Sequence, residues 1–130
     1  MQFLPLVHSA VDLNNFFSLQ YEIPFGIYDS AAIKQPLTLR LGKENEAYLG
    51  LNGRTNSLAG KLVIADCAAP FGSPIVDSER TKVTRDTKEA LHVVFLRPSL
   101  SIEQAEKLVG AVASMFTQIH GGNANSAIIS

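Results

Sequence analysis

The densest group of residues that could do chemistry lies in the segment 77–88, whose sequence is DSERTKVTRDTK. It holds four basic and three acidic side chains around Val83, and its threonines, Thr81, Thr84 and Thr87, are spaced three residues apart. Hydroxyl groups interleaved with Arg and Lys are groups that bind a phosphate or ribose backbone. The same composition is typical of a solvated surface segment, so the pattern by itself leaves both interpretations open.

The rest of the chain lacks the short motifs that usually mark a catalytic or nucleotide site. It has no P-loop, no GxGxxG, no HExxH, no GxSxG and no paired CxxC. His8, His92 and His120 lack metal-ligand spacing, and the single cysteine, Cys67, allows neither an internal disulfide nor a cysteine-rich zinc site. We expect His92 on the solvent side of a strand or in a cleft, and Cys67 buried as a small apolar side chain. We predict no metal and no cofactor.

The composition bounds the class of protein. The chain of 130 residues suits one domain, and its 46% apolar and 18% charged residues exclude a disordered chain. Eleven Lys and Arg against twelve Asp and Glu give a formal charge of −1, which argues against a domain held to nucleic acid by charge alone. No run approaches the ~20 apolar residues needed to span a bilayer, and residues 1–7 make a poor signal peptide. We expect a single domain over residues 1–130 that works in the cytoplasm, away from membranes.

The first helix is predicted over residues 9–21, with Ser9 as its N-cap. Proline and glycine then interrupt the pattern, so residues 24–28 are expected to be irregular. Asp29 or Ser30 is expected to cap a single turn after that stretch.

The C-terminal helix has the clearest pattern. Ser101 and Gln104 are spaced to form a capping box, and apolar residues recur at every third or fourth position over residues 102–119. Gly121 is expected to end the helix. Residues 123–130 have no pattern and are expected to fray.

The strands are predicted between the two helices. Alternating or continuous apolar runs mark residues 37–41, 47–51, 54–58, 61–66 and 90–96. Asn52 and Gly53 predict a tight hairpin turn, and residues 67–77 are expected to form a loop. Consecutive strands without helices between them indicate an α+β fold, in which the sheet packs on the C-terminal helix.

Between about Val11 and Pro98, the chain resembles the editing domain, or B-three/B-four region, of the bacterial phenylalanyl-tRNA synthetase β subunit and the free-standing relatives of that domain. The matching segments are VDLNNFFSLQYEIPFGIYD at 11–29, LTLRLGKENEAYLGLNG at 37–53, KLVIAD at 61–66 and DSERTKVTRDTKEALHVVF at 77–95. The last segment is the most specific and is similar to the free-standing branch.

The resemblance implies a β-rich, layered α+β domain of the PheT/TilS-like type, with a cleft for the end of an aminoacyl-tRNA. In the synthetase, this cleft hydrolyses tyrosine wrongly esterified to phenylalanine tRNA. An aminoacyl ester is already activated, so a water molecule held by backbone groups and neutral polar side chains suffices without a metal or a covalent intermediate. Such a site leaves little trace in a sequence.

The resemblance carries catalytic roles to Asn14 and Glu79. Asn14 stands where the synthetase helix has a threonine of the editing site, and Glu79 would read the amino acid or position water. The alignment leaves open whether Glu79 or Arg80 corresponds to the acidic residue that recognises the tyrosine hydroxyl. Gly26 stands where the family has a histidine that helps the reaction, so the tyrosine-specific site carries over poorly.

A wider set of residues is expected to meet the substrate and the RNA. The residues expected to line the cleft are Asn15, Gly26, Arg80, Thr81 and Thr84. Those expected to meet the tRNA backbone are Lys82, Arg85 and Lys88. The alternatives to a hydrolase are a module that binds an RNA end, an amino acid or another small ligand, and an interaction domain whose cleft is merely inherited. The glycine at position 26 and the charge of −1 favour the binding module.

Free-standing relatives carry a further helical region ahead of the shared part, so we expect this chain to be a short natural variant or a fragment with exposed apolar surface. The side chains expected on that surface are Phe3, Leu4, Leu6, Val7, Phe16 and Phe17. A second copy of the chain would cover them, which predicts a homodimer.

Overall fold

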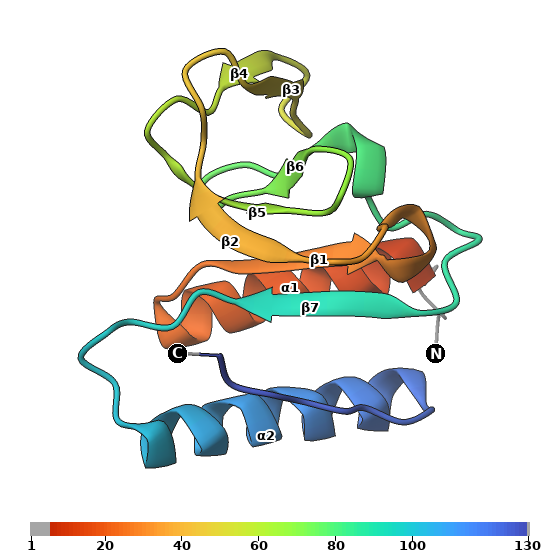
Figure 1. Ribbon diagram of the computed structural model, residues 1–130. Coiled ribbons are helices and arrows are strands. Elements are labelled where there is room, and N and C mark those ends of the chain that lie inside the picture. The colour runs from red at the N-terminus through yellow and green to blue at the C-terminus, as the bar shows by residue number, and fades with distance from the viewer. Residues whose placement is uncertain (1–5, 130) are drawn as a thin grey trace. The chain divides into compact units, whose positions relative to one another are not determined.

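A computed structural model of the protein describes residues 6–129, with the backbone alone for residues 6–9. The described chain divides into two compact units (Figure 1), each of which is considered by itself. Unit 1 comprises residues 6–25 and 94–129, and unit 2 comprises residues 26–93. The expectation of a single domain over residues 1–130 stays a prediction.

Unit 1 contains two helices, α1 (Leu6–Tyr21) and α2 (Ile102–His120). Its core is an apolar cluster formed by Leu13, Phe17, Ile23, Phe25 and Val112. The rings of Phe17 and Phe25 stack with their centroids 5.8 Å apart. Because Phe17 is only 1% exposed, the expectation that it lies on an uncovered surface is wrong, whereas Phe16 is 48% exposed. Phe3 and Leu4 lie outside the described residues.

The two helix starts test the predicted caps. At α2, the Gln104 N–H donates to Ser101 Oγ at 3.1 Å and the Ser101 N–H donates to Gln104 Oε1 at 3.0 Å, so the capping box is confirmed. Gly121 ends α2 with a φ of 75°, as predicted. The N-cap predicted for α1 is wrong, because α1 begins at Leu6 and Ser9 lies inside it. Residues 6–8 contain no helix breaker, so the helix extends to them.

Unit 2 is built from short strands that form small sheets. The strands are β1 (Phe25–Asp29), β2 (Thr38–Leu41), β3 (Ala47–Leu49), β4 (Thr55–Ser57), β5 (Leu62–Ala65), β6 (Pro70–Gly72) and β7 (Ala90–Val94). They pair as β1 with β7, as β2, β5 and β6 in that order, and as the hairpin of β3 with β4. One-turn 3-10 helices, η1 (Ser30–Ala32) and η2 (Glu79–Thr81), lie in the connections. The α+β class is confirmed.

Most of the strands lie where the sequence predicts them. The hairpin is confirmed, but Asn52-Gly53 is not a two-residue turn. Strands β3 and β4 are joined by residues 50–54, with the Gly50 N–H donating to the Arg54 carbonyl oxygen at 2.9 Å and a φ of 78° at Gly53. Two strands are missed, β1 in the stretch expected to be irregular and β6 in the expected loop. Both contain or adjoin proline and glycine, which usually interrupt strands, but β6 is an edge strand that starts at its proline, where no ladder bond is lost.

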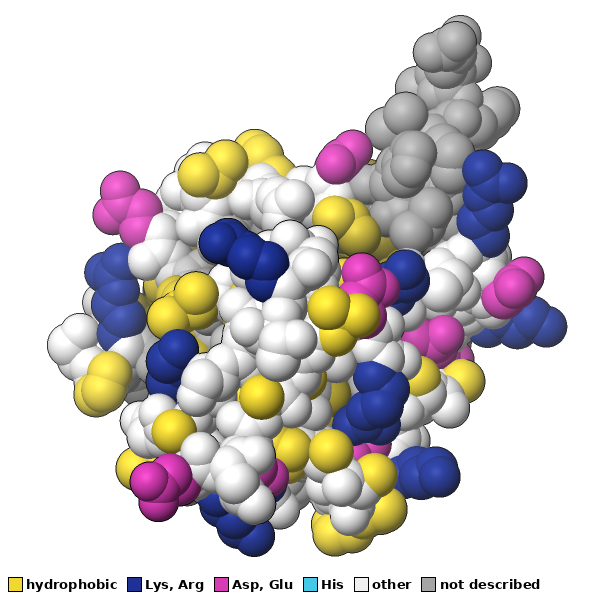
Figure 2. Space-filling view, turned by 90° about the horizontal axis from the view of Figure 1, so that it is seen from above, with side chains coloured by type: hydrophobic (Ala, Val, Ile, Leu, Met, Phe, Trp, Pro, Cys, Tyr) yellow, Lys and Arg dark blue, Asp and Glu magenta, His cyan; other side chains and the backbone are white. Residues whose placement is uncertain are grey.

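The alternation in β2 is real, but its apolar face is not the buried one. Leu39 and Leu41 are 59% and 63% exposed, although alternation predicts a half-buried strand. On the neighbouring strand β5, Val63 pairs with Arg40 and is fully buried, so the opposite face of the sheet is turned to the core. Figure 2 likewise shows hydrophobic side chains at the surface between charged ones.

Asp66, directly after β5, ties together three segments of unit 2. Its fully buried carboxylate accepts two bonds of 3.0 Å from the Arg80 guanidinium and one each from the N–H groups of Lys34, Ala68 and Ala69, also at 3.0 Å. Burial alone would raise the pKa of Asp66, but the Arg80 guanidinium and the backbone N–H donors outweigh it and hold the pKa well below the usual range. The carboxylate therefore remains charged and joins η2 to the end of β5.

Asp66→Ala is expected to lower the free energy of unfolding by about 3 kcal/mol, because it leaves Arg80 and three backbone donors without their acceptor. Urea denaturation measures the loss. Asp86→Ala serves as the matched control, since Asp86 is exposed, and is expected to stay within about 0.5 kcal/mol of wild type. Equal losses in the two variants would contradict the role given to Asp66.

Candidate functional site

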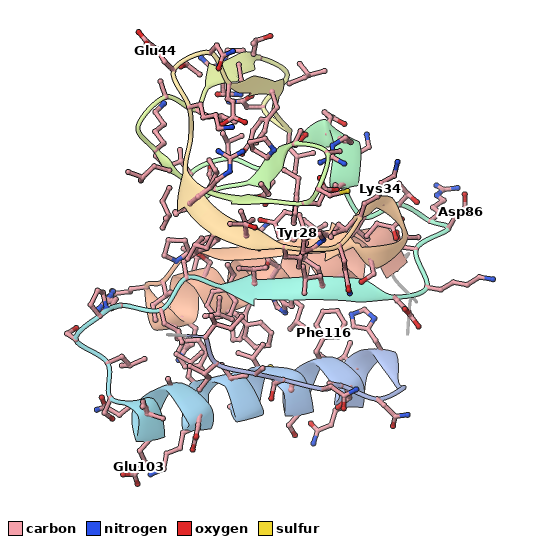
Figure 3. All side chains as sticks on the ribbon, viewed as in Figure 1. Tyr28, Lys34, Glu44, Asp86, Glu103 and Phe116 are labelled. Carbon is pink, nitrogen blue, oxygen red and sulfur yellow. The ribbon has the colours of Figure 1, made fainter. Side chains whose placement is uncertain are left out.

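Tyr28 and Asp77 form a hydrogen-bonded pair inside unit 2. The Tyr28 hydroxyl donates to Asp77 Oδ1 at 2.6 Å, although the two residues are 49 positions apart. Tyr28, on β1, is completely buried, and its ring meets the Phe71 ring edge-on at 4.9 Å and an angle of 85°. Figure 3 places Tyr28 among the strands of the unit, whereas Glu44 and Asp86 point away from the ribbon. The pair therefore joins β1 to the segment that follows β6.

Two glycines make room for the Tyr28 hydroxyl. Gly26 lies two residues earlier on β1, on the same face of the strand, and Gly72 lies on β6. A Cβ atom on either glycine would lie 2.2 Å from the Tyr28 hydroxyl oxygen, a distance that no side chain tolerates. The space beside Gly26, which the resemblance places at the position of a histidine, is therefore filled by Tyr28.

Burial sets the protonation of this pair. It raises the pKa of Asp77 to about 6, although the Tyr28 hydrogen bond opposes the rise. Burial, and then the negative charge of Asp77, raise the pKa of Tyr28 above its usual range. Near pH 7 the phenol therefore keeps its proton and donates a hydrogen bond to a carboxylate that is mostly ionised.

The residues of η2 were predicted to meet the substrate, and they differ in their surroundings. Glu79 is half-buried, and its Oε2 lies 2.8 Å from Lys82 Nζ. Arg80 is bound to Asp66 and to the Ala69 carbonyl oxygen. Thr81 is completely buried, and its Oγ1 has no hydrogen-bond partner among the described residues. Of the two charged residues of η2, Arg80 is thus bound to the buried Asp66, whereas Glu79 is paired with the exposed Lys82.

The later part of the segment 77–88 contains threonines that hydrogen-bond within the protein and cations that are exposed. The Thr84 N–H donates to Thr87 Oγ1 at 2.9 Å, and the Thr87 hydroxyl donates to Asp29 Oδ2 at 3.0 Å. Thr84 Oγ1 accepts from the Asp86 N–H at 3.2 Å. The Thr87 hydroxyl thus holds the loop to Asp29, at the end of β1. The exposed cations of the segment are Arg80, which is bound to Asp66, and Lys82, Arg85 and Lys88.

The two predicted asparagines lie on α1, in unit 1. Asn14 is 7% exposed, and its Nδ2 donates to the Phe25 carbonyl oxygen at 3.2 Å, just before the chain enters unit 2. Asn15 is exposed. The expectation that these asparagines share a pocket with the segment 77–88 stays a prediction.

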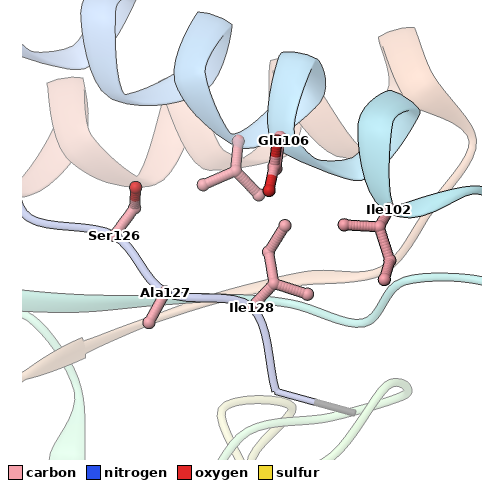
Figure 4. Close-up of a pocket in the computed structure, with 6 residues that line it drawn as sticks. Ile102, Glu106, Ser126, Ala127 and Ile128 are labelled. Atoms are coloured by element: carbon pink, nitrogen blue, oxygen red, sulfur yellow. The ribbon is translucent and has the colours of Figure 1, made fainter.

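Unit 1 has a pocket of about 440 Å³ between α2 and the tail that follows it. The pocket is lined by Ile102, Glu106, Val109, Ser126, Ala127 and Ile128. Figure 4 shows Ile102 and Ile128 on opposite sides of it and the Glu106 carboxylate at its helix side. This pocket contains none of the residues predicted to act on a substrate.

The remaining reactive side chains offer little chemistry. His92 is half-buried, and burial lowers its pKa to about 4, so it is neutral at pH 7. Cys67 is exposed, and its predicted burial is wrong because the bend after β5 turns it outward. Across residues 6–129, His, Cys, Asp and Glu side chains do not gather in groups of three that could hold a metal ion. In the same described range, neither helix combines the length and hydrophobicity of a membrane span.

Local pattern analysis misses the residues at the centre of unit 2, which are Tyr28, Asp77, Gly72 and Asp66. The sequence does hold one indication for Tyr28. If residues 25–29 are taken as a strand, Gly26 and Tyr28 lie on the same face of it. The partners of Tyr28 and Asp66 come from distant parts of the chain, and spacing within one segment does not reveal them.

The fold and site define an α+β domain of small antiparallel sheets around a buried phenol–carboxylate pair. The model of the B3/4 domain family matches residues 1–118, and the chain belongs to this family. The resemblance to the synthetase editing region is therefore confirmed.

Similar proteins include members inside and outside the synthetase. The chain is 30% identical over 121 residues to the uncharacterized protein YhzB of Bacillus subtilis. The aligned region covers 93% of this chain and 52% of YhzB. It is 31% identical over 105 residues to the phenylalanine–tRNA ligase β subunit of Paramagnetospirillum magneticum, covering 78% of this chain and 13% of that subunit. The chain thus spans about half of YhzB and a small part of the ligase subunit.

A solved structure supports the same fold. An N-terminal fragment of the phenylalanyl-tRNA synthetase β subunit from Pyrococcus horikoshii superposes with a TM-score of 0.70 at 17% identity, over 88% of this chain and 41% of that one. At this identity the likeness concerns the fold alone.

Asp77 is expected to make the folded chain less stable as the pH rises from about 4 to about 7. Its folded-state pKa, about 6, lies above that of an unfolded aspartate, so protonation favours the folded state. The contribution of Asp77 to the free energy of unfolding is complete below about pH 4 and is lost as the pH rises through about 6. The loss amounts to about 2–3 kcal/mol. Urea unfolding at each pH measures it, and Asp77→Asn is expected to flatten the curve by that amount.

Two further variants sharpen this measurement. Tyr28→Phe removes the hydrogen bond that lowers the Asp77 pKa, so the midpoint of the pH dependence is expected to move upward. Asp86→Asn, at an exposed aspartate, is expected to leave the curve unchanged. If Asp77→Asn behaves like Asp86→Asn, the buried pair does not control the pH dependence.

Proposed function

We propose that this chain is a free-standing tRNA-editing-like domain that hydrolyses mischarged aminoacyl-tRNA in trans. The observation that carries the proposal is membership of the B3/4 family over residues 1–118, together with similarity to phenylalanine–tRNA ligase β subunits. The similarity to YhzB, which is not described as a ligase, supports action outside a synthetase.

The proposed reaction needs few groups. A water molecule attacks the carbonyl carbon of the aminoacyl ester, and the bond to the ribose oxygen breaks. That oxygen takes one of the water's protons, and the amino acid leaves as a carboxylate after the other proton passes to solvent. Glu79 orients the water or reads the amino acid. Positioning an activated ester and a water molecule supplies much of the rate without a metal.

The other predicted residues divide into two kinds. Thr84 contacts the substrate, whereas Arg80 and Thr81 hold η2 in place through Asp66 and the core. Gly26, predicted to line the cleft, is covered by Tyr28. Lys82, Arg85 and Lys88, which are exposed, contact the RNA backbone.

A second candidate function is a module that binds an RNA end or a small ligand without hydrolysing it. Two observations favour it. Tyr28 fills the space over Gly26, the position of the family histidine, and Glu79 pairs with Lys82 at 2.8 Å, which occupies the proposed catalytic carboxylate. The domain would then keep the fold and its RNA contacts and lack a general base.

Hydrolysis is tested by mixing the protein with a panel of mischarged tRNAs and measuring release of the amino acid. On the substrate tRNA we expect release at least ~10-fold faster than in buffer, and Glu79→Ala is expected to remove most of that gain. Glu44→Ala, which removes an exposed glutamate from the β2–β3 turn, is the matched control and should retain it. No acceleration on any tRNA of the panel would exclude the hydrolase and leave the binding module.

RNA binding is tested separately by reversing charges. Figure 2 shows Lys and Arg side chains dispersed with acidic ones between them, so binding is expected to depend on a few specific contacts rather than on a broad basic field. Lys82→Glu/Arg85→Glu is expected to weaken tRNA binding and to reduce the slope of log K against log salt by about 2. Lys61→Glu/Lys107→Glu makes the same change in net charge at other exposed lysines. Equal weakening by both pairs would mean that overall charge, not this segment, contacts the RNA.

A further inference from the structure

The surroundings of Tyr28 form a slot that fits a phenol on every side. Gly26 and Gly72 flank the hydroxyl end and leave no room for a Cβ atom, and Phe71 meets the ring edge-on at 4.9 Å. Asp77 Oδ1 accepts the hydroxyl proton at 2.6 Å. We call these four residues the phenol slot. We propose that the phenol slot is a binding site for small phenols that the protein's own Tyr28 keeps occupied.

The glycine walls make the slot selective for a flat ring. Because a Cβ on either glycine would lie 2.2 Å from the hydroxyl oxygen, the strands β1 and β6 carry no side chain where the phenol ends. An edge-on aromatic neighbour adds a favourable contact for a ring beyond the area that it buries. A branched aliphatic side chain of the same length would fit neither the width nor the edge-on neighbour.

The carboxylate makes the slot selective for a hydroxyl group. A short bond from a neutral donor to a carboxylate is stronger than one between neutral groups, and a buried carboxylate left unpaired is costly. Asp77 is half-buried rather than fully buried, so the hydroxyl end of the slot is the end closer to solvent. A ligand with a ring but no hydroxyl leaves this acceptor unpaired.

The consequence for the wild-type protein is exclusion. Tyr28 is completely buried and already satisfies Asp77, so an aromatic ligand from solution has to displace it to enter. Tyr28 is thus a specificity-determining residue that closes unit 2 to aromatic ligands at this position. This inference does not depend on the proposed function, because it concerns neither RNA nor an ester.

Tyr28→Ala opens the slot, and phenol is the probe. At ten times its dissociation constant, phenol is expected to raise the melting temperature of Tyr28→Ala by roughly 4–8 °C, and benzene by clearly less. Neither compound is expected to shift wild type. Tyr48→Ala is the matched control, since it truncates a half-buried tyrosine whose hydroxyl donates to the Val76 carbonyl oxygen outside the slot, and it should not respond.

Three results would overturn the proposal: phenol stabilises wild type as much as the variant, it stabilises Tyr48→Ala equally, or it leaves a folded Tyr28→Ala unchanged. If Tyr28→Ala does not fold alone, phenol is expected to restore a cooperative melting transition. If it stays unfolded with phenol, the slot is tested in the protein that keeps Tyr28.

The chain has three tyrosines, and labelling them with ¹³C at Cζ gives one NMR signal for each. The signal that disappears in Tyr28→Phe belongs to Tyr28.

Gly72→Ala is expected to displace that signal, because the added Cβ pushes the phenol out of the slot. Gly110→Ala, where a Cβ meets open space, is the control and should leave the signal in place. An unmoved Tyr28 signal in Gly72→Ala would show that the ring does not depend on the glycine walls, and the proposal would fail.

Discussion

The interior of unit 2 depends on the hydrogen bond between the Tyr28 hydroxyl and the Asp77 carboxylate. The phenol is completely buried, so its hydroxyl depends on the half-buried carboxylate, which accepts its hydrogen bond at 2.6 Å. The bond requires β1 and the segment after β6 to lie at one fixed spacing, and the hydroxyl fits only if positions 26 and 72 carry no side chain. One polar contact thereby dictates two glycines on two strands, and none of these residues can change independently of the others.

A second buried carboxylate gives the segment 77–88 two distinct faces. Asp66 holds Arg80, and Arg80 with the buried Thr81 fixes η2 against the end of β5. The side chains on the inner face of the segment are therefore committed to the fold. Lys82 and Arg85 lie exposed on its outer face, where Lys82 pairs with Glu79. In the sequence, the hydroxyl, basic and acidic residues of this segment fit either a phosphate-binding or a solvated surface segment. In the structure, some of these side chains hold the fold together and others are exposed.

The parts of this fold that the sequence predicts are those decided by neighbours along the chain. The capping box at Ser101 and the hairpin around Asn52-Gly53 each depend on a few adjacent residues. Both are confirmed, although the hairpin loop is longer than the two residues predicted. β1 and β6 are missed because proline and glycine weaken a strand pattern, and because their stability comes from pairing with distant strands. The direction in which the β2 leucines face could not be predicted either, since alternation shows that a strand has two faces without showing which one the core covers.

The same distinction governs the candidate site. Exposed cations can be listed from the sequence, but the occupant of the space at position 26 is decided by Tyr28, whose partner lies 49 residues away. A glycine in place of a histidine suggests an emptied site when the sequence is considered alone, whereas the structure fills that space with a phenol. Under the proposed function, a glycine at this position is compatible with hydrolysis, because a positioned water on an activated ester needs orientation more than a strong base. What the filled space does remove is room for a second aromatic ring, so under the same proposal the amino acid has to be held elsewhere than over Gly26.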